Sequence, residues 1–252
     1  MKLLALVLSF GLAMGSPALV ASESVDPLES ARWGDMRKLF FGTQQLVFDD
    51  RVKVIGPADA ENPMQVPITV DATALGSVQE VLVFADFNPI LQILRFFPQR
   101  ASAFLGFRIK LQQSSPVRAA ALTSDGVWHL GGTWINTVGG GCTAPSAASA
   151  APEWQRRLNE VSGRQWTSGP MSGRVRMRII HPMDTGLVAG IPAFYLEDIE
   201  FLDPEDRLLM RVQPFEPVSE NPVFTVQQVV AGPVRASGRD NNGNTFSVLI
   251  AP

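Results

Sequence analysis

The stretch VRAAALTSDGVWHL, residues 117–130, decides the fold class. It consists of two short runs that favour strands, separated by the pair Asp125-Gly126. An Asp-Gly pair between two such runs is a strong signal for a β-hairpin, because both residues tolerate the positive φ angles of a tight turn. Residues 117–130 therefore predict two neighbouring antiparallel strands.

Further strand patterns surround this hairpin. Alternating apolar residues or short apolar runs occur at residues 66–72, 79–86, 106–112 and 132–138. Residues 88–98 (NPILQILRFFP) fit a helical turn as well as a buried strand. Apolar residues spaced three and four apart predict a short amphipathic helix within 27–42, ended by Gly42. Short strands at this spacing are typical of a β-sandwich.

The composition changes at Thr143. Residues 143–152 (TAPSAASAAP) hold no charged, aromatic or branched aliphatic side chain. They predict a flexible linker, because such a segment buries too little apolar area to offset its ordering entropy. Residues 153–163 predict a short helix. From about Gly173 strand patterns return, and they predict a second β-sandwich, with strands at residues 173–180, 193–203, 207–214, 223–231, 233–238 and 245–250.

The N-terminus has the three parts of a secretory signal. Lys2 gives a positive start, an apolar core follows, and small residues near Ala21 and Ser22 suit a signal peptidase. The apolar run is shorter than the ~20 residues that span a bilayer. Residues 1–22 therefore predict a signal peptide and an exported protein without membrane insertion. The net charge of -3 indicates no class of partner, and it predicts no basic face for nucleic acid.

The chain has a single cysteine, Cys142, which ends the stretch TVGGGC. One cysteine cannot form an internal disulfide, and an odd cysteine in an exported protein suggests an intermolecular bond or a reactive thiol. The alternative is a buried cysteine that acts as a small hydrophobe. The glycines before Cys142 and the small-residue segment after it favour an exposed thiol, since such segments lie on the surface.

Two uses of an exposed thiol compete, catalysis and covalent carriage. Catalysis would need His129 or His181 as a base held rigidly beside Cys142, and a triglycine segment works against this. His129 is interpreted as a strand residue, and His181 as a turn residue whose ring fixes the turn. No spacing resembles a metal site. We therefore expect no catalytic residue, no metal and no cofactor.

Carriage suits the sequence better. Gly139, Gly140 and Gly141 predict a slim flexible arm, and three extended residues reach about 10 Å. No lysine or arginine lies between residues 132 and 152, so the neighbours of Cys142 in sequence give no reason for a strongly lowered thiol pKa.

Motifs in both halves resemble the SoxYZ carrier of bacterial sulfur oxidation, whose SoxY and SoxZ components are normally separate chains. The first half is similar to SoxY in VPITV (66–70), Asn88-Pro89, SSPVRAAALTSDGVWHL (114–130) and a final strand that ends in GGGC. The second half is similar to SoxZ in RVRMRIIHPMDTG (174–186), IPAFYLEDIEF (191–201), VSENP (218–222) and RDNNG (239–243). The single-chain form with GGGCTAP resembles SoxYZ-like carriers associated with quinoprotein dehydrogenases.

The resemblance implies an all-β chain of two immunoglobulin-like β-sandwich domains. A SoxY-like domain (23–142) would be joined by the short flexible linker (143–152) to a SoxZ-like domain (153–252), with short flanking helices. Cys142 would be the covalent attachment point for sulfur intermediates such as those derived from thiosulfate. The chain would not be an enzyme, because other proteins would carry out the oxidation and hydrolysis.

The implied partners are periplasmic sulfur-oxidising enzymes, c-type cytochromes and a quinoprotein dehydrogenase. A disulfide-linked dimer through Cys142 is expected at high concentration. One departure from SoxY matters: Thr143 and Ala144 follow the cysteine where SoxY has further glycines, so the arm is tethered at both ends. The alternative function is an accessory or binding module of a periplasmic quinoprotein dehydrogenase, in which the thiol is not essential.

Overall fold

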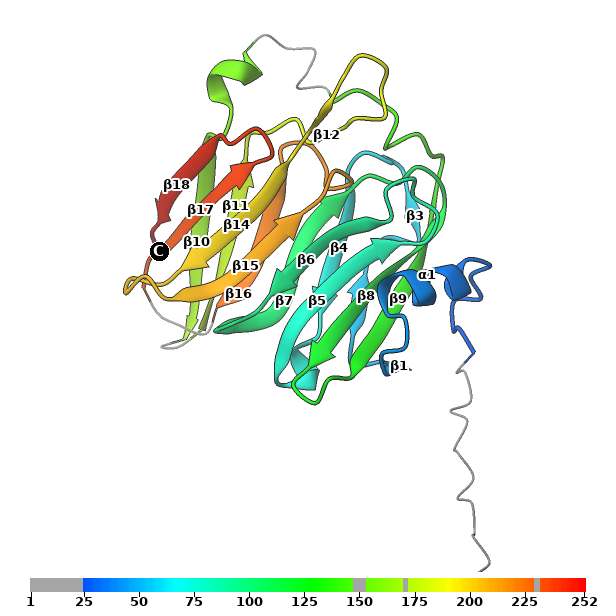
Figure 1. Cartoon of the computed structure of the whole chain (residues 1–252). Helices are drawn as coiled ribbons and strands as arrows, with labels where there is room; N and C mark the ends of the chain where they lie inside the picture. Colours follow the sequence, from blue (N-terminus) through cyan, green and yellow to red (C-terminus); the bar gives the residue numbers. More distant parts are fainter. Residues whose placement is uncertain (1–24, 147–152, 170–171, 229–231) are drawn as a thin grey trace, which may run out of the picture.

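A computed structural model describes residues 25–146, 153–169, 172–228 and 232–252. The expected signal peptide (1–22) and residues 147–152 of the expected linker lie outside these ranges. The described strands form two immunoglobulin-like β-sandwiches placed side by side, with one broad sheet in front of the other (Figure 1). The fold class is therefore the predicted one.

The first half contains one α-helix and nine strands within the described residues. Its elements are α1 (Trp33–Phe40), β1 (Leu46–Phe48), β2 (Lys53–Ile55), β3 (Asp59–Ala60), β4 (Val66–Asp71), the 3-10 turn η1 (Thr73–Leu75), β5 (Val78–Ala85), β6 (Gln92–Phe97), β7 (Ala101–Ile109), β8 (Ser115–Thr123) and β9 (Trp128–Thr137). The predicted hairpin at Asp125-Gly126 joins β8 to β9, and the helix predicted within 27–42 is α1. The ambiguous segment 88–98 contains the strand β6.

The second half begins with a 3-10 turn and continues as strands. Its elements are η3 (Trp154–Arg157), β10 (Val161–Gly169), β11 (Ser172–Ile179), β12 (Asp184–Thr185), β13 (Ala193–Phe194), β14 (Leu196–Leu202), β15 (Leu208–Pro214), β16 (Val223–Gln228), β17 (Val234–Asp240) and β18 (Thr245–Ile250). Residues 241–244, which overlap the RDNNG motif, form the turn that joins β17 to β18.

Three sequence predictions of element boundaries are wrong. The helix expected at 153–163 is only the turn η3, and strands return at Val161 rather than near Gly173. Val161 and the residues after it pair with β11 along its length, and this pairing satisfies more backbone groups than a short helix would. Residues 132–138 do not form a separate strand, because β9 runs unbroken from Trp128 to Thr137.

Both sheets run across the boundary between the halves. The front sheet has the order β1-β9-β8-β5-β6-β15-β14-β17-β18, and the rear sheet has the order β10-β11-β16-β7-β4-β2 (Figure 1). At the join, β6 pairs with β15 and β7 pairs with β16, both antiparallel. Phe96 opposite Val212 and Leu105 opposite Val226 are buried there. The two halves therefore share backbone hydrogen bonds on both layers and one continuous apolar core.

A buried ion cluster fastens the N-terminal segment to the front sheet. The Arg118 guanidinium on β8 donates to the Asp26 carboxylate at 2.7 and 2.8 Å, and its Nε donates to the Asp86 carboxylate at 3.0 Å. The side chains of Arg118, Asp26 and Asp86 are 1%, 7% and 0% exposed. The Arg118 guanidinium also lies 4.8 Å from the ring centroid of Trp33 at the start of α1. This cluster holds residues 26–33 beside the sheet.

Replacing Arg118 with methionine should destabilise the protein strongly. Arg118→Met keeps much of the side-chain volume but leaves two buried carboxylates without their partner, which typically costs about 3–5 kcal/mol. The matched control is Arg95→Met, since Arg95 pairs with Glu80 and is 36% exposed, and such pairs contribute about 0–1 kcal/mol. Urea denaturation measures both changes. Equal effects of the two substitutions would contradict the role given to the cluster.

Candidate functional site

Cys142 lies just beyond the end of β9, in the turn formed by residues 139–144. Its side chain is fully buried, with 0% exposure. The prediction of a solvent-accessible thiol is therefore wrong for this conformation. The glycines that suggested an exposed arm instead allow the turn to pack closely against the segment that follows β7.

Backbone hydrogen bonds hold this turn in place. The Gly140 amide donates to the Gln112 carbonyl at 2.9 Å, and the Gly141 amide donates to the Leu111 carbonyl at 3.0 Å. The Cys142 amide donates to the Gln112 side-chain oxygen at 3.2 Å. The Thr143 hydroxyl shares that oxygen at the same distance. Gln112 is thus the main anchor of the cysteine turn.

Gly139 is required by space and by backbone conformation, and Gly141 is required by space. Gly139 has φ +88°, and a Cβ atom there would lie 2.6 Å from the Gln112 carbonyl oxygen. A Cβ atom on Gly141 would lie 2.2 Å from the Pro63 carbonyl oxygen. Gly140 has φ +86° but open space around it. In this conformation the predicted flexible arm (Gly139, Gly140 and Gly141) is a tightly packed turn.

Lys110 is buried next to the Cys142 thiol. The Cys142 Sγ lies 3.7 Å from the Lys110 carbonyl oxygen, to which it can donate. The Lys110 side chain is only 2% exposed, and its ammonium donates to the Met183 carbonyl and, at 3.5 Å, to the Glu216 carbonyl. A cation from the first half is therefore held beside the cysteine by carbonyls of the second half.

Burial controls the protonation of both groups. Burial raises the pKa of Cys142 above its ordinary value, to about 11, and the nearby Lys110 charge offsets only part of this rise. Burial lowers the pKa of Lys110 to about 8, although the charge of Cys142 acts in the opposite direction. At neutral pH the thiol is therefore protonated and unreactive, because the thiolate is the nucleophile.

The second half covers Cys142 with the turn HPMDTG, residues 181–186. His181, Met183, Asp184 and Thr185 are buried. The Thr185 hydroxyl donates to the Cys142 carbonyl at 2.7 Å. Thr185 belongs to β12, a short strand at one end of the sandwich (Figure 1). The site is thus built from both halves, and neither half alone supplies all of its contacts.

His181 has the structural role that the sequence predicts. Its Nδ1 accepts a hydrogen bond from the Met183 amide at 3.1 Å, and its Nε2 lies 3.6 Å from the Asp240 carboxylate. The ring also packs on Phe194, with ring centroids 4.5 Å apart. Burial lowers the pKa of His181 to about 4, against the opposing charge of Asp240. His181 therefore fixes the turn as a neutral ring.

His129 lies at the other end of β9, where its Nδ1 is 2.7 Å from the Asp49 carboxylate. Thr137 is eight residues further along the strand than His129, a span of about 26 Å at the usual rise. The structure therefore does not bring His129 to Cys142. Among the described residues, no three His, Cys, Asp or Glu side chains are placed to hold a metal ion.

Lys110 is the site residue that the sequence analysis missed. Phe107, Ile109 and Leu111 alternate inward, and this alternation places Lys110 on the outer face. The strand instead ends at Ile109, and Lys110 turns into the interior between the halves. No local pattern signals this, because the carbonyls that receive the ammonium come from residues 183 and 216.

Within the described part of the chain, no helix has the length and apolar character needed to cross a membrane.

Comparison with known proteins gives a separate match for each half. Residues 37–142 match the family model of the sulfur oxidation protein SoxY, and residues 169–249 match that of the sulphur oxidation protein SoxZ. A solved structure of the sulfur carrier protein SoxY from Chlorobium limicola f thiosulfatophilum is similar, with 16% identity and a TM-score of 0.37. The similarity covers 42% of this chain and 96% of that one. No curated protein matches the sequence.

Gly141→Ala should release the cysteine turn. The new Cβ would lie 2.2 and 2.7 Å from two backbone carbonyl oxygens, so the turn must move. Gly140→Ala is the matched control, since its Cβ meets open space and only its positive φ is strained. With a maleimide, native Gly141→Ala should label about tenfold faster than Gly140→Ala, the ratio given by a difference of roughly 1.4 kcal/mol. Similar rates would contradict the close packing of the turn.

His181→Gln should lower stability at neutral pH and flatten its dependence on pH. Because the folded pKa of about 4 lies below the ordinary value, the unfolded chain binds more protons between about pH 6.5 and 4. Wild-type stability therefore falls as the pH falls through this window. Urea denaturation should show the difference between wild type and variant shrinking from pH 7 to pH 4.

The pH profile of Cys142 labelling should keep its shape in a folded His181→Gln variant. The His181 ring bonds to the Met183 amide and faces Asp240, so it has no part in deprotonating the thiol. A profile that shifts by a full pH unit would identify His181 as a base and contradict its structural role.

Proposed function

We propose a function for this chain on the basis of its family membership. The chain belongs to the SoxY and SoxZ families and joins a SoxY domain and a SoxZ domain in one polypeptide. The proposed function is that of a carrier in sulfur oxidation rather than a catalyst. Cys142 would hold sulfur intermediates covalently and present them to partner enzymes. We place the SoxY-like domain at 23–142 and the SoxZ-like domain at 153–252.

One observation supports this proposal most directly. The only thiol of the chain belongs to the last residue of the SoxY match, and the carbonyl of that residue accepts a hydrogen bond from Thr185 in the HPMDTG turn of the SoxZ half. A carrier needs a single attachment point that its own fold can protect between reactions. The junction of the two halves supplies such a protected place.

The buried turn would be the resting state of the carrier. A neutral thiol shielded from solvent resists oxidation, since susceptibility follows thiolate character and exposure. Loading would require residues 139–142 to leave their contacts with Gln112 and Thr185. The hydrogen bonds that this motion breaks join uncharged groups that water can replace, at a net cost of about 0.5–1.5 kcal/mol each. Once free, the glycines would act as the slim arm expected from the sequence.

The loading chemistry balances only with an oxidant. Joining thiosulfate to the Cys142 thiol forms one sulfur–sulfur bond, releases the thiol proton and releases two electrons. A c-type cytochrome partner would accept those electrons, and another partner would later hydrolyse the product. The same proposal places the protein in the periplasm after removal of the signal peptide. It also includes association with a quinoprotein dehydrogenase. A disulfide-linked dimer through Cys142 would form only from the released state.

The burial of Cys142 favours a second candidate function. A thiol with 0% exposure and a pKa raised to about 11 also fits a structural residue. The chain would then be an accessory or binding module of a quinoprotein dehydrogenase, and the thiol would be incidental. The two candidates differ in whether function survives the loss of the sulfur atom.

Tetrathionate tests the carrier function on the purified protein without a partner. Attack of the thiol on tetrathionate forms the Cys142–thiosulfonate adduct and releases thiosulfate and a proton, so no further oxidant is needed. Intact mass should show one thiosulfonate addition that reductant removes, at a rate that rises with pH because burial raises the thiol pKa. Cys142→Ser is the matched control and should gain no mass.

The same substitution separates the two candidates in the cell. In a host that needs the chain for growth on thiosulfate, folded Cys142→Ser should abolish thiosulfate oxidation. Full activity of the serine variant, or a wild-type thiol that reacts with tetrathionate only after unfolding, would contradict the carrier function and support the accessory module.

A further inference from the structure

The outer face of the rear sheet carries a row of arginines. Val175, Met177 and Ile179 of β11 point into the core with 0% exposure, so the residues between them point outward. Arg174, Arg176 and Arg178 occupy those outward positions, and Arg164 on the neighbouring β10 lies opposite Arg176. Arg108 on β7 continues the row across β16. We call these five residues the arginine face: Arg108, Arg164, Arg174, Arg176 and Arg178.

The arginine face is strongly basic although the whole chain has a net charge of -3. The registers of β10, β11, β16, β7, β4 and β2 place six cations on this side, the five arginines and Lys53. The only carboxylate at these outward positions of the described strands is Asp71. The sequence-based expectation of no basic face is therefore wrong, whereas the expectation of no nucleic-acid partner stays a prediction. The net charge conceals a segregation of charge that the sheet creates.

The arginines of this face lack carboxylate partners. Among the described residues, none of the five forms a salt bridge, whereas Arg95, Arg211 and Arg239 of the front sheet all do. The charge of Arg178 does lower the pKa of Glu160, but that carboxylate is paired with Arg157 at 2.7 Å. The guanidinium groups are thus available to a ligand.

Two of these guanidinium groups lie over aromatic rings. The Arg164 guanidinium lies 5.7 Å from the ring centroid of Trp166, and that of Arg174 lies 5.4 Å from Phe104. Trp166 is itself 43% exposed. Arginine and tryptophan are the residues most enriched at the energetic centres of protein interfaces. The composition therefore points to a protein partner.

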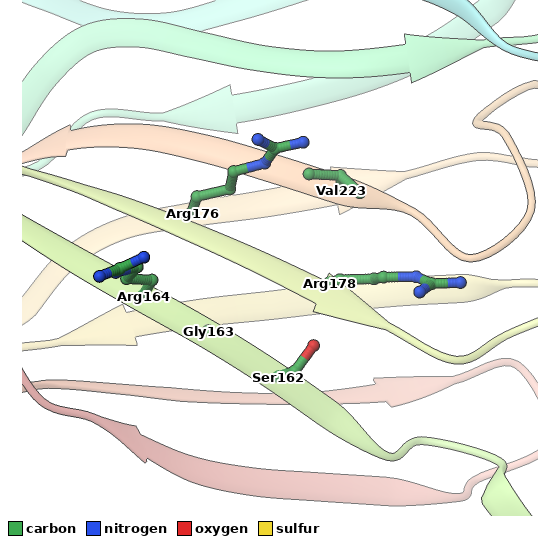
Figure 2. Close-up of a pocket in the computed structure, with 6 residues that line it drawn as sticks. All are labelled: Ser162, Gly163, Arg164, Arg176, Arg178 and Val223. Atoms are coloured by element: carbon green, nitrogen blue, oxygen red, sulfur yellow. The ribbon is translucent and has the colours of Figure 1, made fainter.

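The shape of the face fits an extended partner. Arg164, Arg176 and Arg178 line an open hollow of about 320 Å³ with Ser162, Gly163 and Val223 (Figure 2). A second hollow of about 450 Å³ adjoins it, lined by Trp166, Arg174, Arg176 and Thr225. A third, of about 150 Å³, reaches Arg108. Arg176 lines all three hollows. Together they form a shallow surface groove across the strands rather than an enclosed small-molecule site.

We propose that the arginine face is a docking surface for a partner protein that presents a row of carboxylates. Each guanidinium offers a planar pair of donors that matches a carboxylate, and the complementary charges would speed the encounter. The face adjoins the thiol end of the molecule, because Arg108 is the second-last residue of β7 and Lys110, whose carbonyl lies beside the thiol, directly follows that strand. This proposal stands whether or not Cys142 carries sulfur.

A fluorescein-labelled octaglutamate peptide tests the proposal on the full chain by fluorescence anisotropy. The variant Arg164→Gln/Arg176→Gln/Arg178→Gln should bind about tenfold more weakly than wild type, the size expected from three exposed ion pairs. The control Lys38→Gln/Arg156→Gln/Arg235→Gln removes the same charge from α1, η3 and β17 and should change affinity less than about twofold. Equal losses in the two variants would overturn the proposal.

Two further measurements do not depend on how well the variants fold. A photoreactive octaglutamate peptide should crosslink wild type on β10, β11, β16 or β7, the strands that carry the arginine face, and crosslinks confined to other elements would overturn the proposal. Binding should weaken as NaCl rises, because exposed charges are screened.

Vesicles of phosphatidylglycerol are the competing ligand. Tighter binding of the full chain to these vesicles than to the peptide, lost in the arginine variant, would assign the face to a lipid surface instead.

Discussion

The pairing of β7 with β16 is the constraint on which the rest of the structure depends. On one side, β7 continues into residues 110–112, which hold the cysteine turn through Gln112 and Leu111. On the other side, β16 pairs with β11, and β11 leads into the HPMDTG turn that covers Cys142. The same pairing joins Arg108 to the arginines of β11 on the outer surface. A shift in this register would therefore disturb both the buried thiol and the exposed basic face.

Burial gives the thiol two properties that a single motion would reverse. While the turn of residues 139–142 is closed, Cys142 is out of reach of solvent and its pKa is raised to about 11. Once the turn opens, water surrounds the sulfur and its pKa moves towards the ordinary value of about 8.5. Opening would therefore expose the thiol and activate it together.

Local patterns in the sequence predict much of this structure. The Asp-Gly hairpin, the alternating strands, helix α1 and the structural role of His181 all follow from residues close together in the chain. The burial of Cys142 does not follow from nearby residues, because it depends on Gln112, Pro63 and Thr185, which come from distant segments. Glycines in sequence indicate freedom, but at Gly139 and Gly141 the structure uses the absence of a side chain for close packing. The sheets that cross both halves, and the charge segregation they produce, likewise arise only from long-range strand pairing.

We propose that Cys142 is stored in a closed turn that opens locally while both sandwiches stay folded. Native-state labelling of the thiol in increasing urea tests it most directly, because local and global openings differ in how strongly they depend on denaturant. We expect the free energy of exposing the thiol to lie below that of global unfolding and to be nearly independent of urea at low concentration. An exposure free energy equal to that of global unfolding, with the same urea dependence, would show that Cys142 is a permanent core residue and would contradict local opening of the turn.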